Sequence, residues 1–482
     1  MITKSLIQQF FIKVLRDSSV GSNNEFTTDY WQSLLERICL LCAVLLILVW
    51  PLPGTIAARN IALVTGCLSS LVWMFRSKPI FSLETILPIL SLLAVPIWAW
   101  IHYFVWPTDT VSQLNDLKGT WLRVILCIIM ASGLGLMISI RPNLIYWIWF
   151  AMIVLGIVSL VNFLRETWIL QQWVVDNYHF PFKGKFALVN FLMNACLLAY
   201  AILHYRIKNR INAHSNVGNN FIEVFASLII AVCWLNLVNA QALNGILIAV
   251  LMGLFLLGIL IKIILSTSIK VDIRSIVSLI FFLFILISSI FIYWQVDKKY
   301  HKKLDNLVED IQIAMQIDKH FAWQEDSRNE QVTRPINSDG VEINHSTYSR
   351  VAWFVKGLDL MQENPLGAGF SHLAFRYFIL KEYPDSRIVM THSGWLDYAL
   401  GLGLPGLLLT WLAMVLVIRQ AYNSIKSTEK NIQLTPYLAI WLIGGIWLLW
   451  WPAELSEREF IEQLFFIIAM LGMAQVCPRF KR

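Results

Sequence analysis

The sequence predicts an all-α polytopic membrane protein, and its composition, its long apolar runs and its charge distribution each point to that class. Hydrophobic residues make up 57% of the 482-residue chain and charged residues only 14%, with a mean hydropathy of +0.62. Soluble domains carry about 25% charged residues. The composition therefore excludes a soluble globular protein.

Apolar runs long enough to cross a bilayer recur along nearly the whole chain. A helix needs roughly 20 residues to span about 30 Å of hydrocarbon. By this measure we predict about twelve transmembrane helices, at 34–53, 57–75, 84–105, 120–140, 143–164, 186–204, 220–240, 243–266, 275–295, 394–419, 434–452 and 460–477. The seven cysteines fall in or beside these spans, where packing explains them better than metal or redox chemistry.

Lys and Arg residues gather in alternate connections, which identifies the cytoplasmic side of the bilayer. With these connections inside, both termini lie in the cytoplasm and the one long polar segment lies outside. The predicted organisation is a cytoplasmic segment at 1–33, helices one to nine at 34–295, an external domain at 296–391, helices ten to twelve at 392–477 and a cytoplasmic tail at 478–482. The net charge of +7 mainly reports this topology and does not indicate nucleic-acid binding.

The external segment is too long for a simple connector, so we expect a folded, mostly helical domain. "KKYHKKLDNLVEDIQIAMQI" predicts an amphipathic helix, and a polar loop follows it. A second helix in "YSRVAWFVKGLDLMQENP" should be capped by Ser346 or Ser349. It should end at Asn364 and Pro365. Arg350 would then lie in the first turn, where a cation opposes the helix dipole. Its partner would be a carboxylate or, because a guanidinium can bond two oxygens at once, a phosphate.

Several motifs of this region resemble the O-antigen ligase and polymerase superfamily. They are Ser349-Arg350 in an aromatic-rich helix, "ENPLGAGF" at 363–370, and His392-Ser393-x-x-Leu396 leading into "GLGLPGLL". Upstream, "FKGKFALVNFLMN" at 182–194 resembles the family's glycine- and asparagine-containing stretch before a membrane helix. One element departs from the family. Where the family often has Ser-Arg-Gly, this chain has Leu243-Asn244-Gly245, so no arginine role is transferred there.

The resemblance is strongest to the O-antigen ligase of lipopolysaccharide synthesis. It implies a GT-C-like glycosyltransferase of the bacterial inner membrane that uses no metal or other cofactor. The donor would be a glycan on undecaprenyl pyrophosphate, and the acceptor a sugar hydroxyl of the lipid A core at the periplasmic face. A polymerase or a protein O-oligosaccharyltransferase of the same superfamily would need the same donor site. The polar "AELSEREF" before the last helix resembles the C-terminal ends of ligases, which favours the ligase.

His392 is the expected general base. Transfer of a sugar from a pyrophosphate needs a base at the acceptor hydroxyl and cations at the departing diphosphate. A histidine titrates near neutrality, and the start of a helix through "SGWLDYALG" would favour its neutral form. The alternative is an interfacial histidine that only satisfies a hydrogen bond. Asp397 follows by five positions, roughly 140° around a helix, and is a poor partner.

The helix after His392 should be broken by four residues, which are Gly401, Gly403, Pro405 and Gly406. Irregular backbone at membrane depth is tolerated only against protein or water. We therefore expect a water-filled cavity below the histidine.

Basic residues on the external side are the candidate partners of the pyrophosphate. They are Arg350, Arg123, Lys183, Lys185 and Arg458. Arg123 could instead extend to the membrane interface, and Arg458 could pair with the neighbouring Glu454, Glu457 and Glu459. Lys183 and Lys185 oppose the basic-inside pattern, which favours a functional role for them. Asn190 and Asn194, one helical turn apart, could bond a sugar or another helix.

Functions from other classes fit the sequence less well. A secondary transporter or lipid flippase should place ionisable groups at mid-membrane depth, whereas the predicted helices have almost none there. The sequence has no Asp-x-Asp pair, which argues against a metal-dependent transferase. It also lacks a nucleotide-binding glycine loop, which argues against an ATP-driven pump.

Overall fold

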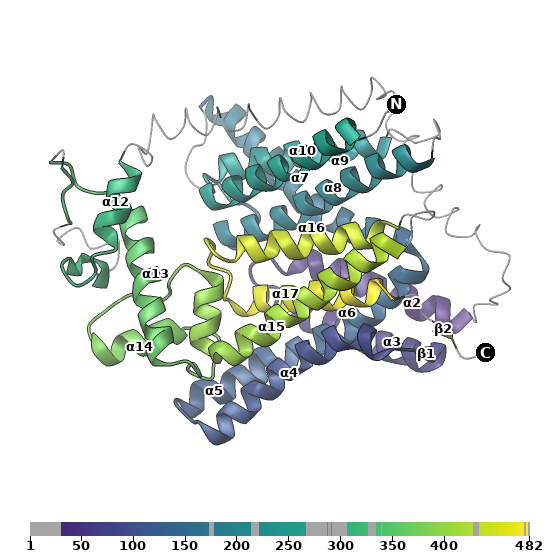
Figure 1. Cartoon of the computed structure of the whole chain (residues 1–482), viewed down its shortest axis with the longest axis horizontal. Coiled ribbons are helices and arrows are strands. Elements are labelled where there is room, and N and C mark those ends of the chain that lie inside the picture. The colour runs from purple at the N-terminus through teal and green to yellow at the C-terminus, as the bar shows by residue number, and fades with distance from the viewer. Residues whose placement is uncertain are drawn as a thin grey trace.

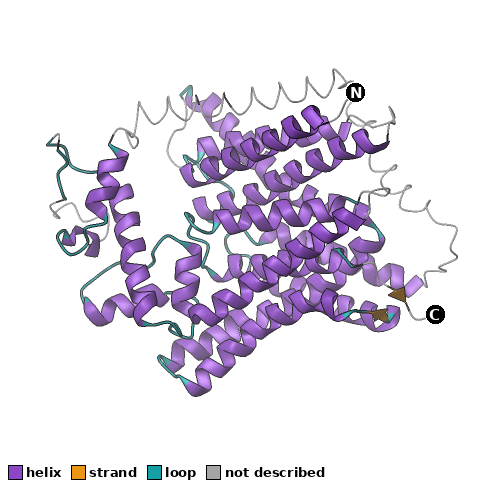
Figure 2. Cartoon of the chain, viewed as in Figure 1, coloured by secondary structure: helices purple, strands orange, loops and turns teal. Residues whose placement is uncertain are grey.

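The computed structural model describes residues 30–172, 178–213, 221–266, 287, 291, 306–325, 334–338, 340–427, 433–476 and 479–480. Most of these residues are helical, which confirms the predicted all-α class (Figure 2). The membrane-region helices are α2 (Tyr30–Val49), α3 (Ile56–Ser77), α4 (Leu83–Val105), α5 (Thr110–Asp116), η1 (Leu117–Trp121), α6 (Leu122–Ile140), η2 (Pro142–Leu144), α7 (Ile145–Leu170), α8 (Lys185–Ala213), α9 (Phe221–Asn239), α10 (Leu243–Ser266), α15 (Gly394–Ser427), α16 (Leu434–Leu449) and α17 (Arg458–Ala474). The long external segment contributes α12 (Leu307–Ala314), η3 (Phe321–Gln324), α13 (His345–Glu363) and α14 (Ala374–Glu382).

Each predicted membrane span apart from 275–295 coincides with a described helix. Within the described ranges, nine helices are long and apolar enough to cross a membrane. α16 and α17 are shorter, with 16 and 17 residues. The predicted 275–295 span lies outside the described residues, apart from positions 287 and 291. The chain is therefore a polytopic all-α membrane protein.

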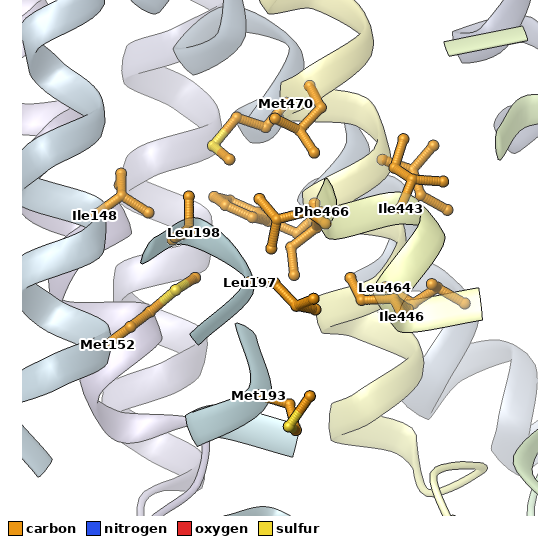
Figure 3. Packing of buried hydrophobic residues seen from close by; sticks show 14 of the residues in the cluster. Ile148, Met152, Met193, Leu197, Leu198, Ile443, Ile446, Leu464, Phe466 and Met470 are labelled. Atoms are coloured by element: carbon orange, nitrogen blue, oxygen red, sulfur yellow. The ribbon is translucent and has the colours of Figure 1, made fainter. Parts of the chain in front are cut away.

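Two helices, α8 and α17, lie at the centre of the bundle and are buried on almost every side. α6 packs along both α17 and α3, while α16 packs along α8 and α15 along α4 (Figure 1). Figure 3 shows Leu198 of α8 between Ile148 of α7 and Phe466 of α17, with Leu197 on the side of Leu464 and Ile446. A helix that is apolar all round requires such neighbours. In lipid, where apolar surface is not driven from water, close van der Waals packing stabilises the contact.

The connections at the two ends of the bundle form two separate groups, which agree with the predicted alternation. At one end lie α5, α12, α13 and α14 (Figure 1). The predicted external connections meet there, since Lys183 N–H donates to Pro51 O at 2.8 Å and Gly394 N–H to Ala453 O at 2.8 Å. At the other end, the strands β1 (Pro79–Ile80) and β2 (Arg479–Phe480) pair antiparallel. The orientation of these ends in the membrane remains a prediction from the basic residues.

The break in α15 is confirmed. Protein backbone, instead of the expected water-filled cavity, lies against it. Gly403 has φ 71° and ψ 178°, outside the helical region. Residues 365–369 of the "ENPLGAGF" motif make backbone hydrogen bonds of 2.8 Å to residues 400–404 across the break. The freed backbone groups are thus satisfied by protein. A Cβ atom on Gly403 would lie 2.3 Å from Leu366 O, so the close approach requires glycine.

The start of α13 differs from the prediction. Asn344 is the N-cap, and its side chain accepts from Thr347 N–H at 3.2 Å, so Ser346 and Ser349 lie inside the helix and do not cap it. Arg350 consequently sits in the second turn, where the helix dipole no longer opposes a cation. The predicted end is confirmed, because the helix stops at Glu363 just before Asn364.

The first external helix is shorter than the predicted amphipathic segment within the described residues. α12 covers Leu307–Ala314, and its buried side chains are Asp310 and Ala314. The Asp310 carboxylate accepts from Asn344 N–H at 3.0 Å, which links α12 to the start of α13.

Replacing Gly403 with alanine should destabilise the protein by more than about 1 kcal/mol, because alanine disfavours positive φ and its methyl group meets the Leu366 carbonyl. Thermal unfolding of the detergent-solubilised protein, followed by tryptophan fluorescence, measures the effect. Gly444→Ala in α16 is the matched control, since nothing lies within 4 Å of its added Cβ. Equal melting temperatures for the two variants would contradict the packing argument.

Candidate functional site

His392 lies in the connection between α14 and α15, and its backbone is held in a strained conformation. Its φ is 61°, in the left-handed region, which costs a residue other than glycine of order 1–3 kcal/mol. Hydrogen bonds on both sides fix the conformation. Thr391 N–H donates to the Asp397 carboxylate at 2.9 Å, and Ser393 N–H donates to Thr391 Oγ1 at 3.1 Å. Asp397 thus holds the backbone of this turn instead of the imidazole.

The imidazole of His392 is held by a carboxylate and an aromatic ring. Its Nδ1 lies 2.6 Å from Glu454 Oε2, and its ring stacks on Trp353 with centroids 5.1 Å apart and an interplanar angle of 23°. Phe186 lies beside it at 6.1 Å. A quarter of the side chain stays exposed, and among the described residues none bonds to Nε2. Because Nδ1 is buried against the glutamate, Nε2 is the nitrogen available to a ligand.

A cavity of about 200 Å³ opens next to His392, and we call it the Arg350 cavity. It lies between α8, α10 and α13, and its lining includes Arg350, Lys185 and Asn244. Phe186, which touches His392, is also part of the lining. Arg350 and Trp353 are three residues apart on α13 and so share one face of that helix. The predicted base and the predicted cation Arg350 are therefore brought together.

Lys185 and Asn244 have polar contacts at the rim of the Arg350 cavity. Lys185 Nζ donates to Gln241 O at 2.6 Å, and an ammonium group has three N–H donors in all. Asn244, which stands where the family often has arginine, donates from Nδ2 to Pro452 O. Sequence reasoning had assigned no role to Asn244, and the structure places it in the lining of the same cavity as Arg350.

Two of the five predicted pyrophosphate partners are engaged by glutamates of the α16–α17 region. Lys183 pairs with Glu457 and, at 3.1 Å, with Glu459. Arg123 lies 3.2 Å from the buried Glu462. Both cations hold helices together within the described structure.

The glutamates themselves are deeply placed and make further contacts. Glu462 is 1% exposed and also accepts from Trp50 Nε1 at 3.1 Å. Glu459 pairs with the buried Arg59 at 2.9 Å. A buried carboxylate is stable only when it is paired and hydrogen-bonded. These contacts therefore fix α2, α3 and α6 against the start of α17.

Arg458 is not paired with its neighbouring glutamates, in contrast to the structural alternative considered from the sequence. Glu454 is taken by His392, and Glu457 and Glu459 by Lys183. Among the described residues Arg458 has no ion pair, and its Nε is buried without a hydrogen-bond partner. Its guanidinium faces a different cavity, between α5 and α14.

The two asparagines of α8 lie in the protein interior. Asn190 Nδ2 donates to Gln463 Oε1 of α17 at 2.6 Å, which is the helix–helix contact considered from the sequence. Asn194 lines a small void of about 20 Å³ that Gln463 and Phe466 also border. Its Oδ1 has no hydrogen-bond partner in the part of the chain that the structure describes. Neither asparagine lines the Arg350 cavity.

Glu454, Trp353 and Arg59 complete the site and were missed as site residues by sequence reasoning. A signal for Glu454 existed, because "AELSERE" is a run of carboxylates between two apolar helices. Nothing in the sequence indicated which base each carboxylate meets. No group of three or more His, Cys, Asp and Glu side chains in the described ranges is arranged to hold a metal ion.

Comparison with known proteins identifies one family. Residues 225–411 match the family model described as O-antigen ligase. The match contains α10, α13, α14 and the first half of α15, and thus Arg350, Trp353 and His392. It confirms the resemblance drawn from the motifs. None of the curated proteins matches the chain.

Loss of the Glu462 carboxylate should destabilise the bundle by about 3 kcal/mol, because Arg123 and Trp50 Nε1 would lose their buried partner. Breaking a buried ion pair usually costs about 3–5 kcal/mol, and we expect the lower end because the Arg123 side chain is 22% exposed. Denaturant or thermal unfolding of Glu462→Ala tests this. The control is Glu342→Ala, whose glutamate is 63% exposed and 3.9 Å from Arg334, and it should change stability by about 0–1 kcal/mol. Similar losses in both variants would refute the assignment.

Proposed function

Residues 225–411 match the O-antigen ligase family model, and from this match we propose that the chain is a member of the O-antigen ligase and polymerase superfamily. The protein transfers a glycan from undecaprenyl pyrophosphate to a sugar hydroxyl of the lipid A core, at the periplasmic face of the inner membrane. One observation carries the proposal. An imidazole held by a carboxylate stands beside a cavity that contains Arg350 and Lys185.

His392 acts as the general base in this proposal. Its Nε2 takes the proton of the acceptor hydroxyl while the hydroxyl oxygen attacks the anomeric carbon of the donor. Glu454 lies at Nδ1, so it orients the ring and stabilises the imidazolium that forms. The same division of roles between a histidine and a carboxylate operates in the hydrolase triad. The stacked Trp353 keeps the ring from turning away.

The leaving pyrophosphate would be received by Arg350 and Lys185. As the bond from the anomeric carbon to the phosphate oxygen breaks, negative charge grows on the diphosphate, and fixed cations lower the energy of that state. Arg350 can bond two phosphate oxygens at once, while Lys185 provides a compact charge in the lining of the same cavity. Lys183 and Arg123 are already neutralised by glutamates, so we assign them to holding the site's helices.

Inversion at the anomeric carbon follows from this arrangement. The base activates the acceptor on one side of the sugar, and the diphosphate leaves from the other, so a single displacement suffices. In this proposal side chains supply both the base and the positive charge, and the transfer needs no divalent metal.

His392→Ala should lower the rate of glycan transfer by about 10²–10⁴-fold, the usual contribution of a general base. The assay combines the purified protein with the carrier-linked glycan and core lipid, with a metal chelator present. His320→Ala, in the same external segment, is the control and should transfer at the wild-type rate. Transfer by His392→Ala at the control rate, or a strict need for divalent metal, would overturn the mechanism.

Glu454→Gln should also slow transfer, by on the order of tenfold or more, because the amide cannot stabilise an imidazolium. The loss should appear in kcat, with the KM for the donor little changed. A rise in donor KM without loss of kcat would place Glu454 in substrate binding instead.

The acceptor distinguishes the ligase from other members of the superfamily. The purified protein is offered core lipid, a second carrier-linked glycan and a hydroxyl-containing peptide in parallel. Transfer to the core lipid alone is the expected result. Preferential extension of the carrier-linked glycan would identify a polymerase, and peptide glycosylation a protein O-oligosaccharyltransferase.

A further inference from the structure

A second, larger cavity lies at the same end of the bundle, and the proposed transfer does not use it. Its volume is about 340 Å³, and it lies between α5, α14 and the start of α17. We call it the Arg458 cavity. In this volume range a cavity accommodates a small ligand. Figure 1 shows α5 and α14 at the same end of the bundle, which also carries α13.

Three basic side chains line the Arg458 cavity. They are Arg458, Arg376 and His372. None of the three has an ion-pair partner among the described residues, and Arg458 Nε is buried without a hydrogen bond. An anion that entered the cavity would give these side chains the acceptor that the described residues do not supply. Burial, together with the nearby Arg458 charge, holds the pKa of His372 below its ordinary value.

The two carboxylates that line the Arg458 cavity are already satisfied by their own surroundings. Asp116 accepts from Thr120 Oγ1 at 2.6 Å, from Trp121 Nε1 at 3.0 Å and from Ser371 N–H at 2.8 Å. Asp109 caps α5, accepting from two backbone N–H groups at 3.1 Å. Neither carboxylate bonds to the guanidiniums, which remain directed to the cavity.

The remaining lining suits a sugar. Phe370 and Tyr377 form an aromatic pair with centroids 5.5 Å apart, and they offer apolar surface to ring C–H groups. The exposed Asn115 supplies an amide that can donate to and accept from hydroxyl groups. A few polar groups on an apolar wall are typical of small-ligand sites.

The Arg458 cavity is linked to the transfer site through one short segment. Glu454, which holds His392, and Arg458 both belong to the connection that leads into α17. A substrate that occupied both places would therefore lie along this connection. Arg350 and Lys185 are absent from the lining of the Arg458 cavity, so the two sites have separate charges.

We propose that the Arg458 cavity binds an acidic sugar of the acceptor through its phosphate or carboxylate group. Identifying the ligand as part of the acceptor rests on the proposed function, whereas binding of the sugar can be measured without any transfer. It gives the enzyme a way to select an anionic saccharide in addition to recognising the hydroxyl that reacts.

Binding is measured by calorimetry with the full-length protein in nanodiscs, using glucose 1-phosphate, glucuronate and neutral glucose as probes. At least one anionic probe should bind, and Arg376→Gln or Arg458→Gln should weaken it by about tenfold or more, because a charged hydrogen bond is lost. The better of the two anionic probes identifies phosphate or carboxylate as the group recognised. Melting temperatures verify that each variant is folded, and Arg376 is exposed, so its replacement should leave the fold intact.

Two controls separate this site from the transfer site. Arg387→Gln removes an exposed arginine of the external segment outside the cavity and should bind the probe as the wild type does. Arg350→Gln should also retain binding. The proposal is overturned if neither anionic probe binds, if glucose binds equally well, if both cavity variants bind normally, or if Arg350→Gln abolishes binding.

Kinetics then test the assignment to the acceptor. In the transfer assay, Arg376→Gln should raise the KM for the core lipid and leave the KM for the carrier-linked glycan unchanged. A rise in the donor KM alone would overturn the acceptor assignment. If the wild-type protein binds the anionic probe but transfers nothing, the proposed function fails while the binding site stands.

Discussion

The carboxylates at the start of α17 and in the connection before it hold together the end of the bundle that carries α13 and α14. Each one meets a base from a different part of the chain. Glu454 meets His392, Glu457 meets Lys183, and Glu462 meets Arg123. Removing charged groups from water costs several kcal/mol per ion, and only a well-placed partner offsets that cost. The helices can therefore assemble at this end in few ways.

The close pairing of these carboxylates also explains why the strained backbone of His392 can persist. The φ of His392 is unfavourable, and such a conformation survives only where the surroundings fix it. Here Asp397 fixes the preceding backbone, Glu454 fixes the ring, and Gly394 bonds to the carbonyl of Ala453. Below this turn, the break at Gly403 is covered by the "ENPLGAGF" segment. The imidazole is thus supported from both the membrane helices and the external segment.

Basic residues at this end of the bundle have two different surroundings, although the sequence does not distinguish them. Arg59, Arg123 and Lys183 are neutralised by glutamates and hold helices together. Arg350 and Lys185 line one cavity, while Arg376 and Arg458 line another. The first group supports the architecture. We propose that the second group binds anionic ligands, and its division between two cavities would suit an enzyme with two charged substrates.

Much of the architecture was determined by the sequence alone. Backbone polar groups in lipid must bond within a helix, so each long apolar run had one stable structure, and the predicted spans in the described ranges are helices. Glycine at 403 and the Asn364–Pro365 pair act locally, and both predicted boundaries were confirmed. Even so, a local rule misplaced the start of α13, where Asn344 caps the helix ahead of the two serines that were expected to do so.

The tertiary structure alone decided which charges meet. Glu454 and His392, or Glu462 and Arg123, are far apart in the chain, and only the packing of α17 against its neighbours brings them together. Packing also decided that protein covers the break in α15, and that Arg458 and Arg350 line different cavities. An ion pair depends on separations of a few ångströms. Helix periodicity and composition do not specify distances between helices on that scale.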